Sequence, residues 1–449
     1  MRVLLVSTYE LGHQPLHLAA AAAEAEAAGH DVRTADVSIG PLADEDVHWA
    51  DRLAIAVPMH TARRLGGDVA ERARALDPDL PIAFFGLYAT VAADDARHRG
   101  VGAFFAGEYE DGLTDWMADP REGEHVATHR HRHRIPVRAS LPPLTEYARL
   151  RIGSEERTAG YAEASRGCRH RCRHCPVPTV YDGRYRIVAP EVVVADVASQ
   201  VAAGARHITF GDPDFWNGPA HAMRVIETVH DEHPEVTFDV TIKVEHLLRH
   251  RELLGRLADA GVVFVVSAFE HTDDEVLRLL DKGHTRADMA EAARLVRDAD
   301  MGLRPTWLPF TPWTTRTHLA DIVRFIDEQG LWAETDPIQL TIRLLLPDGS
   351  LLTGHEAMAP YLSGADDGAL GAAWAHPDPA MDRLAAEVAA LAGGGGCDRD
   401  RLVAIVDAIG RVTGEPMPTV PDVSTGIGLT ESWFCCAEPS ADQLATLRS

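Results

Sequence analysis

Short apolar runs alternate with alanine-rich helical stretches along the first 117 residues of the chain. The apolar runs lie at residues 3–7, 53–57 and 82–87, and the helical stretches lie at 16–28 and 69–75. Short apolar runs of this kind are typical of buried strands, and their alternation with helices is typical of βαβ units in a parallel, doubly wound sheet. We therefore expect an α/β, Rossmann-like domain over residues 1–118.

The carboxyl ends of the strands in such a sheet form a crevice where ligands bind. In this chain the crevice is expected around Tyr9–Pro15, His60 and Tyr88. The sequence contains no G-x-G-x-x-G motif. A dinucleotide is therefore not the expected ligand of this domain.

A second alternating series follows and predicts a partial (β/α)6 barrel over residues 158–360. Its expected strands are 207–210, 237–240, 262–267, 303–308 and 338–346. Its expected helices are 186–203, 223–230, 245–260, 273–280, 286–299 and 317–329. Residues 361–449 are expected to form a mostly helical C-terminal region, which ends in a tail containing adjacent cysteines.

Residues 119–157 are rich in proline, arginine and histidine and are predicted to link the two domains. This linker includes the run His129-Arg-His-Arg-His133. A solvated connector is the main interpretation of the run, because alternating charged and polar residues usually face water. Metal binding by the histidines is the alternative.

Charge and composition narrow the class of ligand. Acidic residues outnumber basic ones by 68 to 43, giving a formal net charge of −25, so a general nucleic-acid-binding role is not expected. No apolar run approaches the ~20 residues of a membrane span, and the first residues lack the features of a signal peptide. We expect a cytoplasmic protein that acts on a small molecule. Its 6 cysteines, three of them clustered, suit metal ligation better than a disulfide framework.

The clustered cysteines are Cys168, Cys172 and Cys175, spaced as C-x-x-x-C-x-x-C on a loop expected after a short strand at 160–164. Three thiolates on one tight loop can ligate three irons of a [4Fe–4S] cluster and leave the fourth iron open. A structural zinc site is the alternative, with His170 or His174 as the fourth ligand.

This spacing resembles that of the radical S-adenosylmethionine (SAM) superfamily, in which SAM chelates the open iron. The resemblance implies that Cys168, Cys172 and Cys175 are catalytic as cluster ligands. One departure is His174, where the family usually has an aromatic residue. The segment 274–285 is similar to a family helix and turn. The resemblance further implies that SAM is positioned at three strand ends, by Gly211, Asp212, Pro213, Lys243, Glu245, Ser267 and Glu270.

A doubly wound domain before the barrel resembles the cobalamin-binding branch of this superfamily. Gly107-Glu108 and the prolines of 141–144 lie where that branch has them. However, the D-x-H-x-x-G motif that supplies a cobalt ligand is missing, and His13 lies in a different context. The sequence therefore leaves cobalamin open as a cofactor.

The adjacent cysteines Cys435 and Cys436 begin a Cys-Cys-Ala-Glu-Pro segment close to the chain's last residue. Paired soft thiolates suit capture of a thiophilic centre, and Cys397, which follows four glycines, could supply a third thiolate. A packed or accidental pair is the alternative. The segment matches the ending of the CCAEP-tail radical SAM proteins, and the chain resembles the radical SAM enzyme of arsinothricin biosynthesis. That resemblance implies transfer of a 3-amino-3-carboxypropyl group from SAM to arsenite.

The sequence thus predicts a radical SAM transferase that receives electrons from a donor such as flavodoxin or ferredoxin. A cobalamin-dependent methyltransferase or ring-modifying enzyme, acting through a 5′-deoxyadenosyl radical, is the first alternative. A non-catalytic, thiol-based metalloid sensor is the second.

Overall fold

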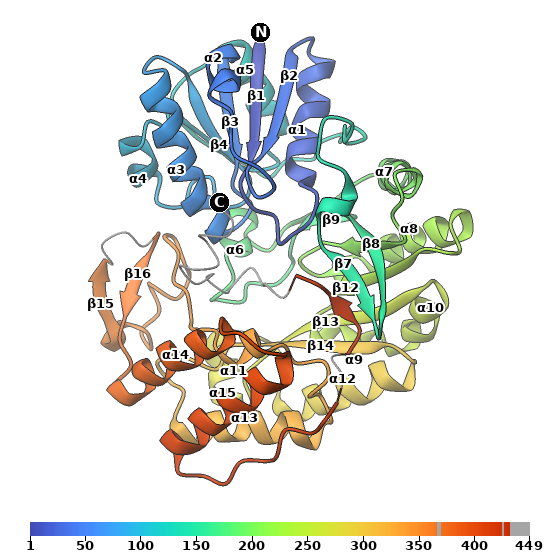
Figure 1. Cartoon of the computed structure of the whole chain (residues 1–449), viewed down its shortest axis with the longest axis vertical. Helices are drawn as coiled ribbons and strands as arrows, with labels where there is room; N and C mark the ends of the chain where they lie inside the picture. The colour runs from blue at the N-terminus through green and yellow to red at the C-terminus, as the bar shows by residue number, and fades with distance from the viewer. Residues whose placement is uncertain (366–369, 424–425, 432–449) are drawn as a thin grey trace.

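A computed structural model of the chain describes residues 1–365, 370–423 and 426–431. Figure 1 shows the N-terminal sheet at one end of the molecule, the barrel sheet beneath it, and the last helices at the far end. Within the described ranges, no helix combines the length and the apolar character needed to cross a bilayer.

The N-terminal domain is a six-stranded parallel sheet with helices on both faces, which confirms the doubly wound prediction. Its strand order is β2-β1-β3-β4-β5-β6, so the order reverses at β1 and opens a crevice at the carboxyl ends of β1 and β3. The strands are β1 (Arg2–Ser7), β2 (Asp31–Asp36), β3 (Arg52–Ala56), β4 (Ile82–Phe85), β5 (Ala103–Gly107) and β6 (Gly123–Ala127). The helices are α1 (Leu16–Ala27), α2 (Asp44–Trp49), α3 (His60–Leu76), α4 (Ala93–His98) and α5 (Glu110–Ala118).

Residues 119–157 are more ordered than a plain linker. Strand β6 pairs with β5 along its whole length, so the N-terminal sheet extends beyond the expected boundary at residue 118. Strand β7 (Arg149–Ile152) and the start of β8 (Glu155–Ala162) also fall in this region and form an antiparallel hairpin. Strand β6 was missed because its five residues are exposed or only partly buried and form no apolar run.

The barrel sheet has the order β14-β13-β12-β11-β8-β7-β17, in which β8 and β11–β14 are parallel neighbours. Its further strands are β11 (His207–Phe210), β12 (Thr237–Thr241), β13 (Val262–Glu270), β14 (Gly302–Trp307) and β17 (Gly428–Leu429). Its helices are α7 (Pro190–Ala202), α8 (Pro219–Glu232), α9 (Val244–Arg249), α10 (Leu254–Asp259), α11 (Asp274–Leu280), α12 (Arg286–Asp298) and α13 (Arg316–Glu328). This arrangement confirms the partial barrel.

The strand expected over 338–346 is not formed. Pro337–Leu340 is instead a short 3-10 helix, followed by a single bridge between Phe310 and Arg343. Pro337 has no amide hydrogen and its fixed φ suits the first turn of a helix. The apolar side chains at 340, 342, 344 and 346 are nevertheless buried, so the sequence pattern identified burial correctly but assigned the wrong conformation.

In the part of the C-terminal region that the structure describes, the helices α14 (Pro379–Ala392) and α15 (Asp398–Thr413) pack on the core of the barrel. It also contains a β-hairpin of β15 (Leu362–Ala365) and β16 (Ala372–Trp374). The short strand β17 pairs with β7 and brings the chain back to the edge of the barrel sheet. The region is therefore helical with an added hairpin and an added edge strand.

The two domains share a hydrophobic cluster. Buried residues of β1, β3 and β4 pack with Val177, Val180 and Tyr181 of α6 (Val177–Tyr181), and Cys168 belongs to the same cluster. Figure 1 shows α6 between the N-terminal sheet and the barrel. The loop that carries the cysteines is thus fixed against the N-terminal domain by apolar packing.

Gly211, directly after β11, tests how closely the barrel is packed. A Cβ at this position would lie 1.7 Å from the Tyr161 hydroxyl oxygen, so we expect Gly211→Ala to destabilise the fold by about 1–3 kcal/mol through overpacking. Gly255 in α10 has no atom within 4 Å of the same position, so Gly255→Ala is the matched control and should raise stability slightly. Thermal unfolding of both variants measures the difference. Equal midpoints would contradict the packing.

Candidate active site

The three clustered cysteines lie on a short loop between β9 (Ser165–Gly167) and α6. Cys168 and Cys172 are buried and Cys175 is partly buried. The loop turns tightly, because the Cys175 amide donates to the Cys172 carbonyl over 3.1 Å. Asn217 holds its first residues, accepting from the Cys168 thiol at 3.6 Å and from the Arg169 amide at 3.0 Å. The structure brings together the three thiols that the sequence predicted as ligands.

The thiols of this loop need positive charge nearby in order to be ionised. Burial, with a contribution from the Asp214 carboxylate, raises the pKa of the Cys168 thiol to about 11. A thiolate at this position therefore needs a cation beside it. Lys282 supplies part of that charge. Burial opposes its protonation, but Glu270 and the sulfurs of Cys172 and Cys175 outweigh burial and raise the Lys282 pKa.

Asp212, expected to contact SAM, is buried directly after β11. Its carboxylate accepts from the Ala164 amide at 2.9 Å and from the Ser165 hydroxyl at 2.6 Å. Burial raises its pKa to about 7, although these two hydrogen bonds oppose the shift. Asp212 therefore ties the end of β11 to the strand that leads into the cysteine loop.

Glu270 ends β13 with a φ of 65°, a left-handed conformation that is strained for a glutamate. One of its oxygens, Oε1, lies 3.0 Å from His174 Nε2 and 3.1 Å from Lys282 Nζ. Burial alone would raise the Glu270 pKa, but Lys282 and His174 outweigh it and lower the pKa. His174, which replaces the family's usual aromatic residue, thus pairs with the Glu270 carboxylate that is expected to contact SAM.

The other expected SAM contacts occupy the same end of the barrel. Lys243 caps α9, and its Nζ lies 3.7 Å from Glu245 Oε2. Glu245 also pairs with Arg249, and its Oε2 lies 3.7 Å from His170 Nδ1. The Ser267 hydroxyl is fully buried and donates to the Ile242 carbonyl at 2.7 Å, so it fastens β13 to the end of β12.

A second polar group borders the cysteine loop and was not predicted. His246 Nδ1 lies 2.6 Å from Asp214 Oδ2, and His246 Nε2 lies 3.3 Å from His170 Nε2. Lys282 was also missed as a site residue, although it belongs to the segment 274–285 that resembles the family's helix and turn. The contacts of His246 and Asp214 depend on neighbouring barrel strands, and no sequence spacing indicates them.

The crevice of the N-terminal sheet faces this site through a series of contacts. His13, in the loop after β1, lies against Tyr161 of β8 with ring centroids 4.6 Å apart. Tyr161 in turn lies against Gly211 beside Asp212. At the outer side of the same loop, Glu431 Oε1 is 3.4 Å from the Tyr9 hydroxyl, and a Cβ on Gly12 would be 2.9 Å from Glu431 Cγ. The last described residue of the chain therefore occupies the crevice.

The burial of His13 predicts a pH dependence of stability. Burial lowers its pKa to about 4, whereas an unfolded histidine titrates near 6.5. Between these values the unfolded chain binds a proton that the folded chain excludes, so stability falls as the pH drops, by about 1.4 kcal/mol per pH unit. We expect His13→Asn to flatten the fall in melting temperature between pH 6.5 and 4, whereas His98→Asn, at an exposed histidine, leaves it unchanged. Parallel curves for all three proteins would contradict this role.

Of the expected acceptor thiols, Cys397 does not lie on the cysteine loop. Cys397 is exposed immediately before α15, and its thiol donates to Asp400 at 3.1 Å. Cys435 and Cys436 lie outside the described residues, and they follow Glu431 by four and five positions. Of the acceptor set, the structure thus places only Cys397.

Residues 163–320 match the family model described as the radical SAM superfamily. Among curated proteins, the chain is 22% identical over 262 residues to the hopanoid C-2 methylase of Rhodopseudomonas palustris, covering 56% of this chain and 48% of the methylase. It is 26% identical over 178 residues to the ribosomal protein uS12 methylthiotransferase of Nitratidesulfovibrio vulgaris, covering 37% and 41%. The chain spans about half or less of these two relatives.

Two solved structures have a similar fold. The radical SAM methyltransferase TsrM from Kitasatospora setae, solved with cobalamin and a [4Fe–4S] cluster, has a TM-score of 0.58 at 19% identity and covers 73% of each chain. The cobalamin-dependent radical SAM enzyme OxsB has a TM-score of 0.65 at 13% identity, over 87% of this chain and 66% of OxsB. At these identities the likeness is one of fold, and it includes both domains.

Proposed function

We propose that this chain, which carries a radical SAM domain over residues 163–320, transfers a 3-amino-3-carboxypropyl group from SAM to a thiophilic acceptor, with arsenite as the acceptor. The observation that carries the acceptor class is the position of Glu431. It lies in the crevice between the domains, four residues before the thiol pair Cys435-Cys436. We propose that this thiol pair serves the same crevice.

A [4Fe–4S] cluster held by Cys168, Cys172 and Cys175 would supply, when bound, one electron and an open iron for SAM to chelate. The protein's own side chains balance charge and position the loop. Lys282 balances thiolate charge, while Glu270 holds Lys282 and His174 in place. Asp212 and Asn217 fix the two ends of the strand and loop that carry Cys168. A carbon radical reacts with whatever lies nearest, so placement of the acceptor decides the product.

The reaction consumes two electrons from a one-electron donor such as reduced flavodoxin or ferredoxin. The first breaks the bond between the sulfur and the γ-carbon of SAM, releasing methylthioadenosine. The resulting 3-amino-3-carboxypropyl radical forms a carbon–arsenic bond with arsenite. The second electron restores trivalent arsenic as hydroxide leaves, so the product is an organoarsenical in the same oxidation state as arsenite.

Removal of the thiol pair tests the acceptor. We expect Cys435→Ser/Cys436→Ser to keep its cluster but to lose at least about tenfold in arsenite-dependent product, because oxygen ligands bind a soft centre less well than thiolates. Cys397→Ser is measured beside it and should keep its product, because Cys397 is exposed and its thiol pairs with Asp400. Product is measured by arsenic-detected mass spectrometry. Unchanged turnover in the double variant would contradict a role for Cys435 and Cys436 in binding arsenite.

A cobalamin-dependent methyltransferase is the second candidate, and the fold likeness to TsrM and OxsB favours it. In this structure, however, Glu431 lies against Gly12 in the crevice where a ligand of the N-terminal sheet would lie. A corrinoid over this loop would require Glu431 to move, and we propose no step through cobalamin. Protein produced with hydroxocobalamin should show no corrinoid absorption bands after desalting. One bound corrinoid per chain would favour the second candidate.

A further inference from the structure

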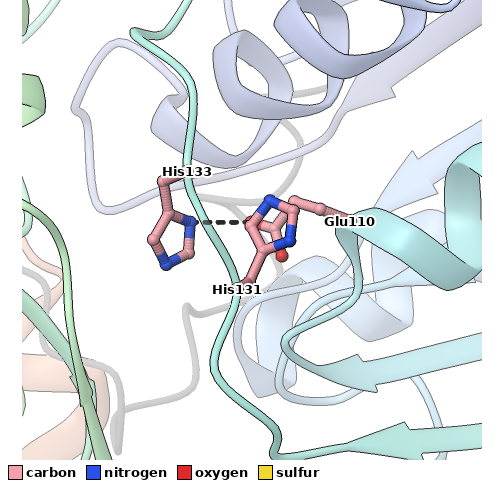
Figure 2. Close-up of side chains that lie close together, drawn as sticks. All are labelled: Glu110, His131 and His133. Carbon is pink, nitrogen blue, oxygen red and sulfur yellow. Dashed lines mark ion pairs between the residues drawn. The ribbon is translucent and has the colours of Figure 1, made fainter.

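The histidine run between the domains lies against the start of α5. Figure 2 shows the imidazoles of His131 and His133 beside the carboxylate of Glu110. All three side chains are buried, with exposed fractions of 8%, 7% and 1% respectively. One donor atom from each lies within 4.8 Å of the other two. The connector is therefore not fully solvated: it folds back and places two imidazoles in the domain junction.

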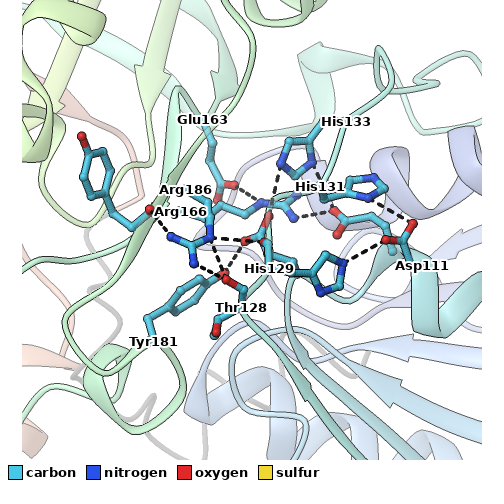
Figure 3. A network of polar contacts seen from close by, with 12 residues as sticks. Asp111, Thr128, His129, His131, His133, Glu163, Arg166, Tyr181 and Arg186 are labelled. Atoms are coloured by element: carbon cyan, nitrogen blue, oxygen red, sulfur yellow. Dashed lines mark hydrogen bonds and ion pairs between the residues drawn. The ribbon is translucent and has the colours of Figure 1, made fainter.

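The charges around these three residues do not balance. The carboxylates of Glu108, Glu110 and Glu163 face one guanidinium, that of Arg166, and one imidazole, that of His133, so three acids meet at most two positive charges. The Tyr181 hydroxyl donates to Glu108 at 2.8 Å but carries no charge. Figure 3 shows Arg166 and Tyr181 beside His133 and Glu163 in this network. Buried charges without a counter-charge are costly, so the group favours an added cation.

One carboxylate oxygen is available to that cation. Glu110 Oε1 accepts from Arg166, whereas Glu110 Oε2 is buried and has no hydrogen-bond partner among the described residues. A cavity of about 30 Å³ adjoins the group and is lined by His133, Glu163 and Arg166. That volume is enough for one water molecule.

We propose that Glu110, His131 and His133 bind a divalent first-row transition-metal ion at a site separate from the cysteine loop. Two imidazole nitrogens and one carboxylate oxygen suit Zn²⁺, Fe²⁺ or Mn²⁺, with water completing the coordination. Donors of a tetrahedral ion lie about 3.4 Å apart, given bonds of about 2.1 Å. His133 Nδ1 lies 3.6 Å from Glu110 Oε1, the oxygen that Arg166 holds, so the Glu110 carboxylate must rotate to turn its other oxygen, Oε2, toward the imidazoles.

The position of this site gives it a structural role. Arg166, which pairs with Glu110, lies two residues before Cys168, and Tyr181, which donates to Glu108, ends α6 just beyond Cys175. A metal ion at Glu110 would therefore fasten the connector, α5 and both sides of the cysteine loop together. The inference does not depend on the acceptor in the proposed function.

Zinc binding tests this site. Full-length, untagged protein with its cluster reconstituted is incubated with ZnCl₂ and desalted, and zinc per chain is measured by mass spectrometry. We expect wild type to hold one more zinc ion than His131→Ala/His133→Ala. His129→Ala is the matched control, because His129 belongs to the same run but is exposed and pairs with Asp111 at 3.0 Å; it should retain the ion. Added zinc should raise the melting temperature of wild type and of the control but not of the double variant.

Equal zinc content in wild type and the double variant would overturn the proposal. So would an equal loss from His129→Ala, because that pattern means loose chelation by the exposed run. If the double variant does not fold, His131→Asn is measured instead, since an amide can still pair with Glu24 and Asp111, the present neighbours of His131. Retention of the ion by His131→Asn would then count against the site.

Discussion

Cys168→Ala is expected to fold but to lose its cluster and with it all SAM cleavage. Cys168 is buried among apolar residues of the N-terminal sheet and α6, so alanine fits there at little cost in stability. Two remaining thiolates do not hold a cluster with one open iron. We expect iron and sulfide near zero, no absorption near 400 nm, and no adenosyl product above the background without protein.

Cys397→Ala is the matched control for that loss. Cys397 is exposed at the start of α15 and is not part of the cysteine loop. The control should keep full iron content and full SAM cleavage. Iron retained by Cys168→Ala at the wild-type level would refute the assignment of the ligands, whereas loss in both variants would point to a general effect of removing a thiol.

Glu270→Gln should lower both stability and SAM cleavage. Glu270 pairs with Lys282 and His174, so its neutralisation leaves the Lys282 ammonium buried without a counter-charge. Breaking one side of a buried ion pair costs about 3–5 kcal/mol. Because its neighbours lower the Glu270 pKa in the folded state, this contribution is present at neutral pH and is lost as the pH falls below about 4.

Two further variants separate charge balance from function. Glu270→Gln/Lys282→Met removes both charges and should recover most of the melting temperature while SAM cleavage stays low. Glu275→Gln changes a fully exposed glutamate of α11 that pairs with Arg278, and it should match wild type in both measurements. A double variant that recovers full SAM cleavage would show that Glu270 acts on stability alone.

The cysteine loop and the alternation of strands and helices could be predicted because their signals are local. Three cysteines within eight residues need no tertiary contact to be noticed, and β–α alternation repeats along the chain. Strand β6 and the segment 338–346 were assigned incorrectly for a local reason as well. The first has a mostly exposed polar surface, and the second has buried apolar residues on a backbone that Pro337 starts as a helical turn.

The contacts that join the two domains could not be predicted. Arg166 and Glu110 are 56 positions apart and meet only because β9 lies against the start of α5. His133 reaches Glu108 only because the connector folds back onto α5. A charged residue looks the same in sequence whether it faces water or a buried partner, so spacing alone favoured a solvated connector.

The products of SAM cleavage test whether the 3-amino-3-carboxypropyl group is transferred to arsenite. Anaerobically reconstituted protein is reduced with dithionite and given SAM with and without arsenite, and adenosyl and arsenic products are followed by mass spectrometry. We expect the amount of methylthioadenosine to rise with arsenite, together with an organoarsenical that bears the 3-amino-3-carboxypropyl group. If 5′-deoxyadenosine is the sole adenosyl product and arsenite does not change its amount, the proposed transfer to arsenite is contradicted.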